Sequence, residues 1–181
     1  MKKLSLSLLF GIMLAWSSCI SEPMEQGQYG SKLSVGDTIP NFSVVTLDRD
    51  TVSRDNRNAE TLVILFFHTE CGDCQKELPV VEQVYRDCRQ DSLWQLICIG
   101  RSEDTATVRR YWQQNQFTMP VSPQPDRLIY ERFAYSGVPM LYVVNGRNII
   151  RAIFDDQNMA TYEELKGWIL KVNEENQKDK S

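Results

Sequence analysis

Long apolar runs and helix-spaced apolar positions follow one another along the chain. Two runs rich in strand-forming residues, TLVILFF at 61–67 and LWQLICIG at 93–100, are typical of strands buried on both faces of a sheet. Between them, the apolar residues of 78–88 recur at helical spacing, so a helix is expected to follow the first strand. The pattern predicts a strand, a helix and a second strand.

The second half of the chain continues this alternation. SEDTATVRRYWQQNQ, at 102–116, is predicted to be helical, and a shorter helix is expected near 128–133. PMLYVVNGRNIIRAIF, at 139–154, is predicted to form a hairpin because strand-forming residues flank its Asn-Gly turn. A last helix is expected to begin at Thr161, which can form a capping box with Glu164. Strands that alternate with helices predict an α/β fold with a partly parallel sheet.

The remaining segments bound a single domain. At 181 residues and 42% hydrophobic content, the chain has room for one globular domain with a core. A short hairpin is predicted at 41–53, where apolar residues alternate loosely about a polar turn. Polar residues without periodicity at 20–34 predict a tether, and the charged segment 174–181 predicts a solvated tail. The domain is therefore expected to cover 35–173.

The first residues are typical of an export signal. Two lysines precede an apolar run that ends at Trp16, and this run is shorter than the roughly 20 residues that a membrane span needs. Two serines then lead into Cys19, an arrangement that resembles a bacterial lipoprotein signal. This resemblance implies a signal peptide at 1–18, a lipid on Cys19, and an anchor and tether at 19–34. Trp16 replaces the smaller aliphatic residue usual in such signals, which leaves ordinary cleavage and a free Cys19 as the alternative.

Charge and cysteine content narrow the possible environments and partners. Cleavage before Cys19 would remove two of the 20 basic residues and none of the 24 acidic ones, so the formal charge would change from −4 to −6. Such a charge argues against nucleic acid as a partner. In an oxidising compartment a close cysteine pair can form a disulfide. Cys88 and Cys98 are interpreted as small buried residues, with a bridge to another cysteine left open for Cys88.

The candidate chemistry lies in the sequence FFHTECGDCQKELP, at 66–79. Cys71 is expected in the first turn of a helix, where free backbone N–H groups and the helix dipole favour a thiolate, so it is the candidate nucleophile. Cys74 lies one turn further on. It can attack a mixed disulfide formed on Cys71, release the partner and leave a Cys71–Cys74 disulfide.

Several motifs, in this order and at matching spacings, resemble the thioredoxin fold. They are the strand at 61–67, the Cys-x-x-Cys that opens a helix, Pro79, and SGVPM at 136–140 ahead of the last hairpin. VGDTIPNFSVVTLDRDTV, at 35–52, and QKELP, at 75–79, are similar to the extracytoplasmic TlpA and ResA type within the redoxin-like AhpC/TSA superfamily. The resemblance covers about 35–172 and implies a mixed central β-sheet flanked by helices, with an added N-terminal β-hairpin.

The resemblance implies a thiol-disulfide oxidoreductase that needs no cofactor. Cys71 would be the attacking cysteine and Cys74 the resolving one. Glu77 matches a glutamate that such reductases carry close to the cysteines, where it would relay a proton to Cys74; the alternative is a solvated helix residue. Pro139 would be a cis-proline packed against the disulfide, and Val138 would offer its backbone to an extended substrate peptide.

The chain departs from the family pattern around the cysteines. Glu70 stands where an aromatic residue is usual, Asp73 lies in a dipeptide that commonly contains proline, and Leu65 occupies the position of thioredoxin's buried acid. Carboxylates near a thiol disfavour its thiolate and make a dithiol a stronger reductant. We therefore expect a potential nearer thioredoxin's, about −270 mV, than DsbA's, about −120 mV. His68, if protonated, would act in the opposite direction.

Other interpretations of the cysteines remain open. They could form a static disulfide, or bind a metal together with His68, although a fourth ligand is not evident. A peroxidase of a related fold would have a threonine three positions before its cysteine, where this chain has His68, and Thr69 comes one residue late. A non-catalytic binding module is a further alternative.

The expected partners follow from the predicted export and chemistry. They are exported proteins with disulfides and a membrane thiol electron donor, met in the cell envelope by a lipid-anchored protein that faces the periplasm or the cell exterior. Reduction is the expected direction, with isomerisation and oxidation as alternatives.

Overall fold

The computed structural model describes residues 28–56 and 59–180. The predicted signal peptide and Cys19 lie outside these residues. No helix in the described ranges is long and apolar enough to cross a membrane. The elements are β1 (Gly30–Ser31), β2 (Ser43–Val45), β3 (Thr51–Ser53), β4 (Thr61–Phe67), α1 (Gly72–Cys88), β5 (Trp94–Arg101), α2 (Thr105–Asn115), β6 (Val121–Gln124), α3 (Tyr130–Phe133), β7 (Ala134–Ser136), β8 (Met140–Val144), β9 (Ile150–Asp155) and α4 (Tyr162–Lys178).

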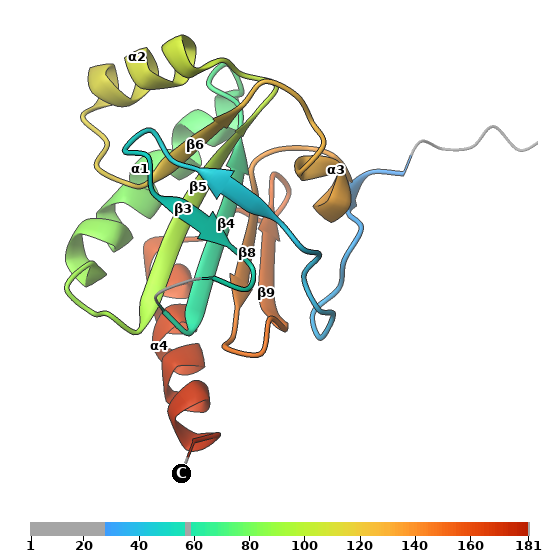
Figure 1. Ribbon diagram of the computed structural model, residues 1–181, viewed down its shortest axis with the longest axis vertical. Coiled ribbons are helices and arrows are strands. Elements are labelled where there is room, and N and C mark those ends of the chain that lie inside the picture. Colours follow the sequence, from blue (N-terminus) through green and yellow to red (C-terminus); the bar gives the residue numbers. More distant parts are fainter. Residues whose placement is uncertain (1–27, 57–58, 181) are drawn as a thin grey trace, which may run out of the picture.

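A five-stranded mixed sheet forms the centre of the fold, in the order β6-β5-β4-β8-β9 (Figure 1). Strands β4, β5 and β6 are parallel, whereas β8 and β9 run antiparallel to their neighbours. The predicted β8–β9 hairpin is confirmed, as is the hairpin formed by β2 and β3. The α/β fold class with a partly parallel sheet is therefore confirmed.

The two phenylalanines that end β4 show which helices cover which face of the sheet. Adjacent strand residues point to opposite faces. The Phe66 ring packs 5.5 Å from the Tyr130 ring of α3, whereas the Phe67 ring packs 5.0 Å from the Trp112 ring of α2. Helices α2 and α3 therefore lie on opposite faces. In Figure 1, α1 lies behind the sheet and the β2–β3 hairpin in front of it.

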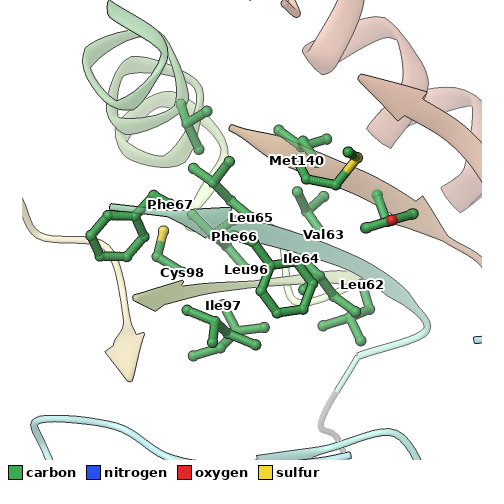
Figure 2. Packing of buried hydrophobic residues seen from close by; sticks show 14 of the residues in the cluster. Leu62, Val63, Ile64, Leu65, Phe66, Phe67, Leu96, Ile97, Cys98 and Met140 are labelled. Carbon is green, nitrogen blue, oxygen red and sulfur yellow. The ribbon is translucent and has the colours of Figure 1, made fainter. Parts of the chain in front are cut away.

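The core is centred on β4, as its unbroken apolar run predicts. All seven residues of this strand are buried because a strand and a layer of structure cover it on each side. Figure 2 shows its side chains extending to both faces of the sheet, where they meet Leu96, Ile97 and Cys98 of β5 and Met140 of β8. This packing fixes the end of β4, from which the chain turns into α1.

The segment 174–181 is predicted to be a solvated tail, but its residues up to Lys178 are helical, although most of the described ones are exposed as predicted. Helix α4 begins at Thr161 with the predicted capping box and continues to Lys178. Asn176 is only 6% exposed. Its side-chain amide donates to the Thr61 hydroxyl at 3.0 Å, and its carbonyl oxygen accepts the Gly146 N–H at 3.0 Å. The helix extends because these hydrogen bonds join its polar end to the sheet.

The prediction of a tether up to residue 34 also needs correction at its C-terminal end. Residues Gly30 and Ser31 form β1, which pairs with β7, and the Lys32 N–H donates to the Phe133 carbonyl at 2.9 Å. The Tyr29 hydroxyl donates to the carboxylate of Asp156. These hydrogen bonds hold the segment from Tyr29 onward against the domain.

Candidate functional site

Cys71 lies where the end of β4 passes into α1. It is the N-cap residue of α1, with extended dihedral angles, and its sulfur accepts the Cys74 N–H at 3.3 Å. The first N–H groups of a helix have no partner within the helix, so a sulfur at this position is a natural acceptor. The Cys71 thiol also donates to the Val138 carbonyl at 3.1 Å. The structure thus places Cys71 at the helix start, as predicted, and brings it into contact with a distant loop.

The loop that meets Cys71 contains a cis peptide bond between Val138 and Pro139, as the resemblance to the thioredoxin fold implied. The loop begins at Gly137, whose positive φ of 87° suits glycine. The Tyr130 hydroxyl donates to the Gly137 carbonyl at 2.6 Å and ties the loop to α3. These contacts bring Val138, which is followed by the cis-proline Pro139, to Cys71, although Val138 is 67 residues away along the chain.

Cys74 lies in the first turn of α1, three residues after Cys71, and is completely buried. Burial raises the pKa of its thiol well above the usual range, and the hydrogen bond with Cys71 adds to this effect, whereas a backbone hydrogen bond from His68 opposes it. A buried thiol of this kind is a poor nucleophile until a base removes its proton.

Glu77, the predicted proton relay, lies on α1 together with Cys74. The two residues are three apart on α1 and therefore share a face of the helix. Glu77 is 2% exposed, so its interpretation as a solvated helix residue is wrong. Desolvation raises the pKa of Glu77 from 4.5 to about 7, although its Oε1 accepts the Ala160 N–H at 3.2 Å, which favours the ionised form. Such a group can accept or donate a proton near neutral pH.

The other acids and the histidine surround the opening of the site. Asp73 forms an ion pair with Lys76 at 2.8 Å, whereas Glu70 is exposed. The Glu70 N–H donates to His68 Nδ1 at 3.2 Å. His68 Nδ1 also lies 3.8 Å from Oε1 of Glu103, a buried acid that the sequence analysis did not single out. Of these groups, Asp73 therefore has its charge partly compensated by Lys76.

A shallow cavity of about 420 Å³ opens beside Cys71. Tyr29, Arg101 and Asp156 contribute to it, and none of them was predicted as a site residue. Arg101 lies at the end of β5 with its guanidinium 4.7 Å from the centre of the Tyr130 ring. Because parallel strands end at the same edge of a sheet, residues after β5 could have been expected near the site. The lining residues are Tyr29, His68, Glu70, Cys71, Arg101, Gly137, Val138 and Asp156.

The alternative interpretations receive little support from the geometry. Within 28–56 and 59–180, no three His, Cys, Asp or Glu side chains are grouped so that they could hold a metal ion. The Thr69 hydroxyl, the nearest candidate for a peroxidase threonine, is bound to Glu103. The four described cysteines are free thiols. Cys98 is buried, and its sulfur lies 3.9 Å from that of Met119.

Comparisons with known proteins agree with this geometry. The model of the AhpC/TSA family matches residues 35–153. The thiol-disulfide oxidoreductase ResA of Bacillus anthracis is 22% identical over 175 residues, which are 95% of this chain and 99% of that protein. ResA of Oceanobacillus iheyensis is 19% identical over 139 residues, covering 75% of this chain and 71% of the relative.

Solved structures share the fold. A putative protein disulfide isomerase from Bacteroides thetaiotaomicron superposes with a TM-score of 0.72 at 21% identity, covering 81% of this chain and 92% of that one. StoA from Bacillus subtilis superposes with a TM-score of 0.61 at 21% identity, covering 71% and 96%. At these identities the likeness shows the fold alone.

Proposed function

The chain belongs to the AhpC/TSA family, and from that premise we propose that it is a thiol-disulfide oxidoreductase that reduces disulfides of exported proteins through Cys71 and Cys74. The observation that carries this proposal is the position of the Cys71 sulfur, which caps α1 between the Cys74 N–H and the Val138 carbonyl. A sulfur held there is activated by the helix terminus and is open to the cavity through which a substrate disulfide can approach.

The reaction takes two exchange steps. The Cys71 thiolate attacks one sulfur of the substrate disulfide, so that the substrate S–S bond breaks and a Cys71–substrate disulfide forms, while the released substrate thiolate takes up a proton. Cys74 then gives its proton to the Glu77 carboxylate and attacks the Cys71 sulfur. The Cys71–Cys74 disulfide forms and the second substrate thiol leaves with a proton. Two electrons pass to the substrate, and a thiol donor must return two to the protein.

The position of the cis loop supports a protein substrate. An extended peptide beside Val138 and Pro139 would bring its cysteine to Cys71, because the Val138 carbonyl already contacts that sulfur. In the reduced protein the Cys71 thiol donates a hydrogen bond to this carbonyl, and that bond would break when the sulfur attacks the substrate. Glu70, which is exposed and lines the cavity beside Cys71, supports the reducing direction, since nearby negative charge disfavours a thiolate.

The location and partners are also part of this proposal. Cleavage of a signal at 1–18 and a lipid on Cys19 would place the protein on a membrane of the cell envelope. Nine residues, 19–27, then precede the first described residue, and a chain of that length reaches at most about 30 Å. A membrane thiol donor could therefore reach the Cys71 site. The folded domain begins near residue 29 rather than 35.

Insulin reduction by the protein, with dithiothreitol as the electron source, tests this function. We expect turnover by the wild type, and loss of turnover in Cys71→Ser and Cys74→Ser. Cys88→Ser is the matched control, because Cys88 is a partly exposed cysteine at the far end of α1 and should leave the rate unchanged. A wild type that does not accelerate insulin reduction would favour a non-catalytic binding module.

A further inference from the structure

A buried carboxylate lies directly beside the turn that leads into Cys71. Glu103 follows β5, and its side chain is only 2% exposed. The register of the parallel strands explains its position. Phe67 of β4 pairs with Gly100 of β5, so the residues that follow the two strands come side by side. Glu103 therefore reaches the His68–Cys71 turn although it is 34 residues away from Thr69.

Thr69 is held from two sides in this turn. Oε1 of Glu103 accepts the Thr69 N–H at 2.9 Å and also the Thr69 hydroxyl. From the opposite side, the side-chain amide of Gln75 in α1 donates to the Thr69 carbonyl at 2.8 Å. The backbone of Thr69 thus has its donor bound by the loop after β5 and its acceptor bound by the helix that carries the cysteines.

We propose that Glu103 is a positioning residue for Cys71. Thr69 precedes Cys71 by only two residues, so the bonds to Glu103 fix the direction in which the chain enters α1. That direction decides whether the Cys71 sulfur can reach the Cys74 N–H and the Val138 carbonyl together, at 3.3 and 3.1 Å. The inference rests on the proposed function of Cys71 as the attacking thiol and adds a residue to that site.

The two oxygens of the Glu103 carboxylate have different surroundings. Oε2 is buried and has no hydrogen-bond partner among the described residues. It lies against Gly100, where an added Cβ would approach it to 3.1 Å, so a side chain at this position would crowd it. Burying a carboxylate with an oxygen unpaired is unfavourable. A carboxylate nevertheless makes stronger hydrogen bonds to the N–H and hydroxyl of Thr69 than a neutral acceptor would.

The chain offers a matched control for this arrangement. Glu82 is also a buried acid, and its carboxylate likewise accepts the N–H and the hydroxyl of a threonine, Thr118, at 2.9 and 2.8 Å. It lies eleven residues after Cys71, roughly 16 Å along α1. Replacing Glu82 therefore removes a similar pair of hydrogen bonds, together with those from Arg86 and from the Met119 N–H, without touching the turn before Cys71.

The test is the rate at which iodoacetamide alkylates Cys71 at pH 7, measured by mass spectrometry in the full chain. Glu103→Leu should slow alkylation by about 5- to 10-fold, because the thiolate loses part of its contact with the helix N-terminus. Glu103→Gln keeps a side-chain oxygen for Thr69 and should restore the rate to within about threefold of wild type. Glu82→Leu should lose thermal stability but keep the wild-type rate.

Equal alkylation rates in Glu103→Leu and the wild type would overturn the proposal, as would an equal loss in Glu82→Leu or a failure of Glu103→Gln to restore the rate. If Glu103→Leu does not fold, Thr69→Val, which removes only the hydroxyl donor, should give a smaller loss in the same direction, and an unchanged rate would overturn the proposal. Alkylation needs no disulfide substrate. A protein that fails in the insulin assay can therefore still confirm or refute the role of Glu103.

Discussion

Glu77→Gln is expected to change how the free energy of unfolding depends on pH. The buried Glu77 carboxyl has its pKa raised from 4.5 to about 7, so the folded protein binds a proton more tightly there than the unfolded chain does. Below about pH 4.5 the Glu77 carboxyl is protonated in both the folded and the unfolded state, so it does not lower the free energy of unfolding. As the pH rises toward 7, ionisation of this carboxyl lowers the free energy of the unfolded state, and the folded state becomes less stable relative to it. The difference in pKa corresponds to about 3 kcal/mol, fully present only above pH 7.

Guanidinium denaturation at pH 5, 6, 7 and 8 measures this effect. The wild type should lose stability relative to Glu77→Gln across this range, by a total of about 2.5 kcal/mol. The glutamine keeps an oxygen to accept the Ala160 N–H, so the comparison isolates the charge. Asp104→Asn is the control. Its pKa is lowered by hydrogen bonds from Thr107, and its titration falls below this pH range, so its curve should run parallel to the wild type.

The same variant tests the proton transfer that the mechanism assigns to Glu77. Without a carboxylate to take the proton of Cys74, the second exchange step should slow, and the mixed disulfide on Cys71 should accumulate during turnover. The pH profile of the rate should also lose its inflection near 7. Stability curves of wild type and Glu77→Gln that stay parallel from pH 5 to 8 would refute the reasoning about burial, and an unchanged pH profile would refute the catalytic role.

Three further predictions concern other parts of the structure. Cys74→Ser should trap a stable disulfide between Cys71 and its substrate, visible as a band that dithiothreitol removes, and no such band with exported proteins would argue against them as substrates. Asn176→Ala should lower the free energy of unfolding by about 1–3 kcal/mol in denaturant titrations, because it leaves the buried Thr61 hydroxyl and a backbone N–H without partners; no change would mean that the end of α4 frays. Glu70→Gln should make the redox potential less negative, by roughly 10–30 mV, whereas a shift in the other direction would show that Glu70 does not act through its charge.

Local patterns were sufficient to predict the central elements and the cysteine pair. The apolar run at 61–67 could be recognised as a central strand because burial on both faces removes the polar alternation. The start of α1 at Cys71 and the capping box at Thr161 follow from helix-end chemistry that involves only neighbouring residues. The hairpin around Asn145 likewise depends on a local turn preference.

Features that depend on strand register or on polar packing could not be predicted in this way. The contact between Glu103 and Thr69 requires knowing that β4 and β5 are neighbours and that Phe67 pairs with Gly100. The burial of Asn176 was missed because a charged, polar segment normally predicts solvent exposure. Tyr29 was assigned to a tether because a two-residue strand has no detectable periodicity.

The most direct test of the central claim is a redox titration of Cys71 and Cys74. The protein would be equilibrated in buffers of defined thiol-disulfide potential, and the fraction of reduced pair determined by alkylation and mass spectrometry. The proposed reductase predicts one two-electron transition at a potential nearer to about −270 mV than to about −120 mV. A midpoint above roughly −150 mV, or a pair that does not interconvert, would contradict it.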